Sequence, residues 1–167
     1  GGWWTLDLGA DLRLGLKADN PESEVGTMLT MAYTRAETFG GQATLALQAG
    51  LGPGTTLANT SDPEAEADAL AGRALATTTF ALDGGVVGQA VALAEWQSDR
   101  REWVSIGARP VFPLFEPIYL AIEGGIDHVW DAEGEARTLG KATIALEYKP
   151  TGGAFFDRPV ARVFATT

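Results

Sequence analysis

The stretch that decides the fold is residues 5–17, TLDLGADLRLGLK. Every even position from 6 to 16 carries leucine or alanine, whereas aspartate, arginine or lysine occupies four of the odd positions. Helical spacing would scatter these leucines around the axis, but a strand alternates its side chains between two faces and places them all on one. The stretch therefore predicts a long β-strand with one apolar and one polar face.

The same alternation recurs along the whole chain. It predicts nine strands, at residues 5–17, 24–36, 41–52, 72–82, 87–97, 103–112, 118–129, 139–149 and 160–166. Most connections between them are short and rich in Gly, Asp, Asn or Pro, which leaves no room for crossover helices. Neighbouring strands are therefore expected to be antiparallel, in an all-β, up-and-down arrangement.

The length of the predicted strands favours a membrane barrel. Strands of soluble sheets typically have about 5 to 6 residues, whereas tilted membrane-spanning strands need about 9 to 11. Compact turns gather on one rim and longer, charged loops on the other, as in outer-membrane barrels. We therefore expect a transmembrane β-barrel whose leucines contact lipid. A soluble barrel that binds a small apolar ligand among inward-facing leucines would show the same alternation and stays an alternative.

We expect a single domain over residues 1–167, interrupted by a long acidic loop at about residues 52–71. Its composition favours a solvated loop over a helical turn at residues 64–70. An odd number of antiparallel strands leaves the last strand parallel to the first. The predicted sheet therefore either gains a tenth short strand from residues 52–71 or forms part of a larger barrel, because open edges are costly in lipid.

Composition excludes several classes of function. The chain of 167 residues has 22 acidic and 12 basic residues, a formal charge of −10, which disfavours a nucleic-acid partner. It has no cysteine and one histidine, His128, so most thiolate and histidine chemistry is absent. Glu123 and Asp127 lie about 13 Å apart along one strand face, too far for a retaining glycosidase pair. We expect neither an enzyme nor a cofactor or metal site.

Two stretches resemble a known family. Residues 103–110, WVSIGARP, and residues 152–166, GGAFFDRPVARVFAT, with residues 118–127 between them as part of the same resemblance, are similar to strands of the maltoporin family. The second is the more specific motif. Residues 4–11, WTLDLGAD, and the turn at residues 38–40 resemble the family less specifically, in the same order.

The resemblance implies a porin in the outer membrane of a Gram-negative-type cell, assembled as a homotrimer, through which sugars and small solutes diffuse passively. Phe39 and Phe156 match positions of the aromatic path along which sugars slide in this family. Family barrels contain about twice as many strands as this chain. A fragment of such a barrel, or a minimised or engineered scaffold without a native substrate, is therefore an alternative to a complete channel.

The charged face of the strands supplies the other candidate site residues. On the membrane hypothesis it faces a polar lumen, the only place within a bilayer where these charges find partners or water. The residues expected to contact sugar are Phe39, Phe156, Arg109, Arg158, Arg162, Glu123 and Asp127. Two alternatives stay open: the charges form an ion-pair network that only fills the barrel, and the aromatic residues anchor the membrane interface.

Overall fold

The computed structural model describes residues 4–15, 24–57, 65–98, 101–158 and 160–167. They form nine β-strands and two short 3₁₀ helices. In chain order the elements are β1 (Trp4–Gly15), β2 (Glu24–Thr38), β3 (Gly41–Leu51), η1 (Gly52–Thr56), β4 (Leu70–Ala81), η2 (Asp83–Gly85), β5 (Val87–Gln97), β6 (Arg101–Phe115), β7 (Ile118–Asp131), β8 (Ala136–Tyr148) and β9 (Ala161–Thr166). Among the described residues, no helix is long and apolar enough to cross a membrane.

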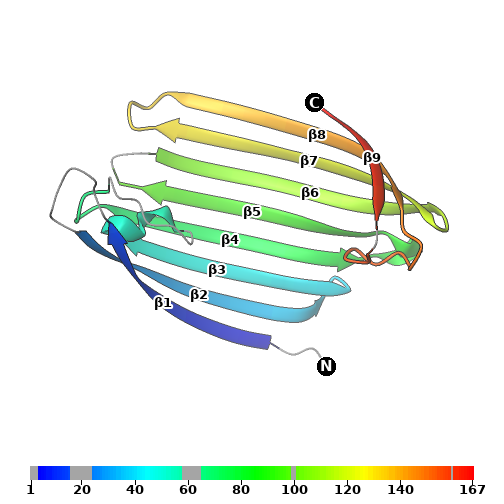
Figure 1. Cartoon of the computed structure of the whole chain (residues 1–167), viewed down its shortest axis with the longest axis horizontal. Coiled ribbons are helices and arrows are strands. Elements are labelled where there is room, and N and C mark those ends of the chain that lie inside the picture. The colour runs from blue at the N-terminus through cyan, green and yellow to red at the C-terminus, as the bar shows by residue number, and fades with distance from the viewer. Residues whose placement is uncertain (1–3, 16–23, 58–64, 99–100, 159) are drawn as a thin grey trace.

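The nine strands form one antiparallel sheet in which each strand pairs with its neighbours in the chain, in the order β1 to β9 (Figure 1). The predicted all-β, up-and-down fold class is confirmed. The β2–β3, β4–β5, β6–β7 and β8–β9 connections lie together at one end of the strands, which we call the compact rim (Figure 1). The first three are short, as predicted, but the β8–β9 connection is longer than the predicted turn and spans residues 149–160.

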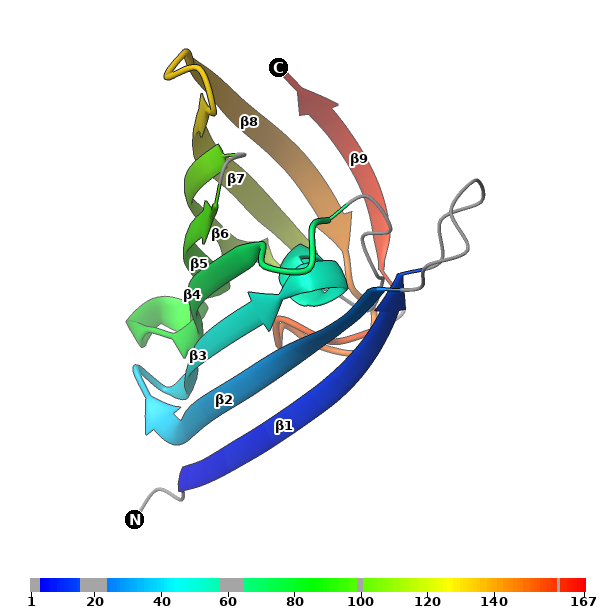
Figure 2. The same ribbon diagram turned by 90° about the vertical axis from the view of Figure 1, so that its left-hand side faces the viewer.

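The sheet curves into a trough (Figure 2). Cross-strand register keeps the two faces separate: Leu8 pairs with Met31, and the adjacent Asp7 pairs with Ala32. Leu8, Met31 and most leucines and isoleucines of the outer face are exposed. The charged face is the concave one, because η1 and the β8–β9 connection lie inside the trough (Figure 2). The alternation seen in the sequence thus produces an apolar convex face and a polar concave face.

The sheet is not closed within the described residues: β1 and β9 are its two edges. No tenth strand is present in the described parts of the predicted loop, residues 52–57 and 65–69. Nine strands without a closing partner suit the wall of a larger barrel better than a complete channel, because each unpaired backbone group in lipid costs several kcal/mol.

The prediction of a solvated loop is wrong for residues 52–57. This segment packs on the concave face, where Leu57 is buried against Met28 and Ala71. Arg73 Nη1 donates to the Leu57 carbonyl oxygen at 2.7 Å, and Gln97 Nε2 donates to that of Thr55 at 3.4 Å. These contacts satisfy carbonyl groups that an exposed loop would offer to water.

Close packing of η1 requires glycine, and this gives a first prediction. A Cβ atom on Gly54 would lie 2.2 Å from the Thr27 carbonyl oxygen. We expect Gly54→Ala to displace η1 and to lower the free energy of unfolding by about 1–3 kcal/mol, the usual cost of overpacking. Urea titration monitored by tryptophan fluorescence measures this change. Gly124→Ala is the control, because a Cβ there meets nothing within 4 Å; equal midpoints for both variants would contradict the packing described.

Candidate solute-binding site

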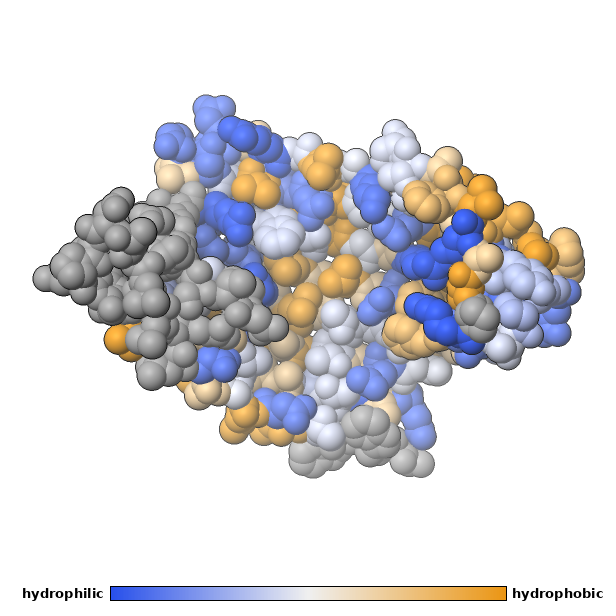
Figure 3. Space-filling view, in the orientation of Figure 1, coloured by the Kyte–Doolittle hydropathy of each residue, from blue (hydrophilic) through white to orange (hydrophobic). Residues whose placement is uncertain are grey.

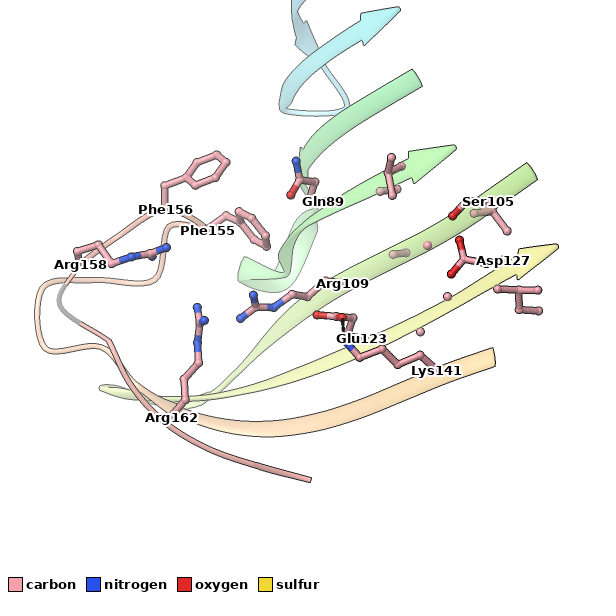
Figure 4. Close-up of a pocket in the computed structure, with 18 residues that line it drawn as sticks. Gln89, Ser105, Arg109, Glu123, Asp127, Lys141, Phe155, Phe156, Arg158 and Arg162 are labelled. Atoms are coloured by element: carbon pink, nitrogen blue, oxygen red, sulfur yellow. Dashed lines mark hydrogen bonds and ion pairs between the residues drawn. The ribbon is translucent and has the colours of Figure 1, made fainter. Parts of the chain in front are cut away.

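A hollow of about 480 Å³ lies on the concave face over strands β5 to β8 and extends toward the compact rim. Figure 3 shows this face hollowed along its middle, with hydrophilic and hydrophobic residues side by side. Figure 4 shows the labelled polar and aromatic side chains that line the hollow. They are Gln89, Ser105, Arg109, Glu123, Asp127, Lys141, Phe155, Phe156, Arg158 and Arg162.

Beside the hollow, three basic side chains surround one carboxylate. Glu147, on β8, has a side chain that is 0% exposed. Its Oε1 accepts from Arg109 Nη2 and lies 2.7 Å from Arg162 Nε, and its Oε2 lies 3.3 Å from Lys149 Nζ. The register explains the arrangement, because Glu147 pairs with Tyr119 on β7 and with Arg162 on β9. The cluster therefore joins β6, β8 and β9 at the compact rim.

At the other end of the hollow, acidic and basic side chains are more evenly balanced. Lys141 Nζ lies 3.2 Å from Glu123 Oε1. Asp127 Oδ1 accepts a hydrogen bond from Trp103 Nε1 at 3.1 Å. These groups lie on β6, β7 and β8, where inward-facing positions of adjacent strands meet. They offer both donors and acceptors to a bound polar solute.

The β8–β9 connection supplies the aromatic wall. Phe155 and Phe156 make an edge-to-face pair with ring centroids 4.9 Å apart, and the Arg109 guanidinium lies 5.7 Å from the Phe155 centroid. Asp157 Oδ2 accepts from the Ala154 amide at 2.8 Å, and Lys149 Nζ donates to the Ala154 carbonyl oxygen at 3.3 Å. These bonds fix the turn that presents both rings beside the arginines.

The structure brings six of the seven predicted site residues to the hollow: Arg109, Glu123, Asp127, Phe156, Arg158 and Arg162. Phe39 does not line it. It is exposed in the β2–β3 turn, with a positive φ of 53°, on a part of the compact rim separated from the hollow by β3 and β4. Its match to the family motif gave no information on the distance between two rim turns.

Several residues at the hollow were not predicted as site residues. Lys141 belongs to the charged face that the alternation predicts to line the lumen, although it was not among the predicted sugar contacts. Phe155 adjoins the matched Phe156 in the sequence. Gln89 lies beside Arg109 only because β5 and β6 pair in this register. Its role depends on cross-strand pairing that one strand alone does not reveal.

A second ion-pair group lies near the opposite rim. Glu95, whose side chain is buried, lies 2.6 Å from Arg73 and 3.3 Å from Arg101. Arg73 also hydrogen-bonds the carbonyl oxygen of Leu57 at the end of η1, so this group has a structural role. It supports the alternative in which some of the charged side chains on the concave face form ion pairs that fill and rigidify the barrel. Arg13 and Lys17, two of the charged residues that alternate with leucine in residues 5–17 and belong to the face predicted to line the lumen, lie outside the side chains that the structure describes. No group of three potential metal ligands occurs among the described residues.

An antiparallel sheet with an exposed apolar convex face and a charged, hollowed concave face is built as the wall of a porin barrel. The family model of the LamB porins matches residues 3–167. The chain therefore belongs to the LamB porin family, which confirms the resemblance to maltoporins. This family consists of outer-membrane sugar channels rather than enzymes.

Proposed function

We propose that this chain forms part of the wall of an outer-membrane channel through which maltodextrin-type sugars and small solutes diffuse passively. The observation that carries the proposal is the concave hollow, in which an aromatic pair stands beside charged groups of both signs. In this proposal the channel has lipid around its convex face and assembles as a homotrimer. It contains no cofactor and makes no covalent bond to the solute.

The chemistry of the hollow suits a pyranose. An aromatic ring offers a flat apolar surface to the C–H groups of a sugar, while the hydroxyl groups point sideways to polar partners. Phe156 supplies that surface, and Glu123, Asp127, Arg109 and Arg162 supply acceptors and donors. Each contact is exposed to water and individually weak, which allows a solute to leave as readily as it enters.

Phe39 and Phe156 are assigned to the exit of the sugar path, and their removal gives a second prediction. We expect the double variant Phe39→Ala, Phe156→Ala to weaken oligosaccharide block of the ion current about thirtyfold, because each of the two stacked rings contributes about 1 kcal/mol and about 1.4 kcal/mol corresponds to a factor of ten. Small-ion conductance is expected to change little. Current block is measured in a planar bilayer.

Phe115→Ala is the matched control, because Phe115 is as exposed as Phe39 at 68% and does not line the hollow. Single variants separate the two assignments. Unchanged block in Phe156→Ala would remove the aromatic path from this hollow, whereas unchanged block in Phe39→Ala alone would remove only the residue that the structure places elsewhere. A sheet that conducts ions but shows no sugar block would favour the alternative of a scaffold without a native substrate.

A further inference from the structure

The hollow is unevenly charged, and its end at the compact rim is strongly basic. Four basic side chains, Arg109, Lys149, Arg158 and Arg162, gather there with two carboxylates, those of Glu147 and Asp157. Two positive charges are therefore in excess, although the whole chain carries −10. A local reversal of sign on an acidic protein concentrates anions at that place.

Neither carboxylate is directed at the hollow. Glu147 is fully buried and already contacts three cations, and Asp157 Oδ2 accepts the Ala154 amide hydrogen. A solute in the hollow therefore meets the arginines and not their counter-ions. This arrangement leaves the excess charge on the surface that a solute touches.

The three arginines keep donors for a ligand. Arg162 contacts Glu147 through Nε, and Arg158 Nη1 donates to the backbone oxygen of Asp157 at 2.9 Å. The side chains of Arg109 and Arg162 are 25% and 33% exposed, so water or a solute reaches them. Figure 4 shows the guanidinium groups of Arg109, Arg158 and Arg162 directed into the same space below the Phe155 and Phe156 rings.

We propose that this end of the hollow is a subsite for an anionic substituent, a carboxylate or a phosphate group, carried by a sugar. Guanidinium groups match such planar or tetrahedral anions through paired N–H donors, and the charge strengthens each hydrogen bond. The sugar ring would lie against Phe156, and its hydroxyl groups would extend toward Glu123, Lys141 and Asp127. The inference rests on the proposed function and narrows it to a preference for acidic sugars.

The test compares three ligands on the channel-forming protein in a planar bilayer: a neutral oligosaccharide, the same oligosaccharide ending in a uronic acid, and the same oligosaccharide carrying a phosphate ester. We expect both anionic ligands to block the current about tenfold more tightly than the neutral one at low salt, as charge-assisted contacts predict. The preference is expected to shrink as salt is raised.

Arg158→Gln and Arg162→Gln are expected to weaken block by the anionic ligands several-fold more than block by the neutral ligand, and so to reduce this preference. Arg137→Gln is the control, because Arg137 is 85% exposed in its side chain and lies at the rim opposite the compact one. Arg162 pairs with the buried Glu147, so Arg162→Gln can perturb folding. Arg158 forms no ion pair with a carboxylate among the described contacts, so Arg158→Gln still tests ligand binding.

The outcomes separate the two proposals. Block by the neutral ligand with no anionic preference overturns the subsite and leaves the sugar channel standing. A preference that persists unchanged in both arginine variants also overturns the subsite. Block by neither kind of ligand contradicts the proposed function itself. A preference for only one anion supports the subsite and identifies whether it takes carboxylate or phosphate.

Discussion

Glu147→Gln is expected to lower the free energy of unfolding by about 3 kcal/mol, because it leaves buried or half-buried cations without their counter-ion. Glu147 is the carboxylate shared by Arg109, Lys149 and Arg162, and the side chains of Glu147 and Lys149 are 0% and 1% exposed. Removal of the Glu147 charge therefore leaves a buried Lys149 without a counter-ion, close to two arginines that have lost the same partner. Urea titration of the protein folded in lipid vesicles, followed by tryptophan fluorescence, measures the change.

The matched control is Glu123→Gln on the neighbouring strand. Glu123 also pairs with a lysine, Lys141, but the two side chains are 40% and 56% exposed. Water screens this pair, so we expect a loss below about 1 kcal/mol. Similar losses for the two variants would show that water reaches Glu147 as well, and would contradict the buried cluster.

The sequence was sufficient to predict the sheet, because strand identity depends on spacing between near neighbours. Strand β5 has the predicted bounds of residues 87–97, and the other strands differ from the prediction by a few residues at their ends. Some strands extend because pairing continues past the last alternating residue, as in β6, which runs from Arg101 to Phe115 through Pro110 and Pro113, whereas β1 stops two residues before its predicted end. Alternation in the sequence indicates on which face of the sheet a side chain lies, but it does not indicate how far the neighbouring strand extends.

The contacts between distant parts of the chain could not be predicted in the same way. The segment of residues 52–57 looked like part of an acidic, solvated loop, yet it packs against the sheet because Gly26, Gly50 and Gly54 allow the backbones to approach closely. A glycine in a strand is compatible with a bend, a bulge or such a contact. Only the fold shows which of these it serves.

The candidate site was predicted in part for the same physical reason. Arg109, Glu123, Asp127 and Arg162 have the inward phase of their strands, so alternation placed them on the face that forms the hollow. Phe39 and Phe156 were chosen from motifs in two turns, and the position of a turn along the rim follows from strand order and sheet curvature. Neither motif indicates that four strands, β4 to β7, lie between the β2–β3 and β8–β9 hairpins that carry these two residues.

The face that contacts lipid gives the prediction with the other large effect. Ile144 lies on the convex face, where it pairs with Ile122 on β7 and Ala165 on β9, and both isoleucines are exposed. An arginine placed there must carry its charge into hydrocarbon if this face is embedded. We expect Ile144→Arg to cost about 2 to 4 kcal/mol near the bilayer midplane. Leu8→Arg, at an exposed leucine on β1, tests the opposite edge of the sheet. Urea titration in lipid vesicles measures both.

Thr143→Arg is the sharpest control, because Thr143 adjoins Ile144 in the chain and pairs with Glu123 on the concave face. An arginine there stays on the watery concave side and gains a carboxylate neighbour, but it removes the hydroxyl that hydrogen-bonds Thr166 at 2.9 Å, so we expect a loss no larger than about 1 kcal/mol. The two variants introduce the same residue at adjacent positions of the same strand, so they differ mainly in the face of the sheet that carries the arginine. Equal costs for Ile144→Arg and Thr143→Arg, or a wild-type protein that folds in water without detergent, would place the isoleucines away from lipid. The alternative of a soluble barrel would then apply, with the leucine face turned inward.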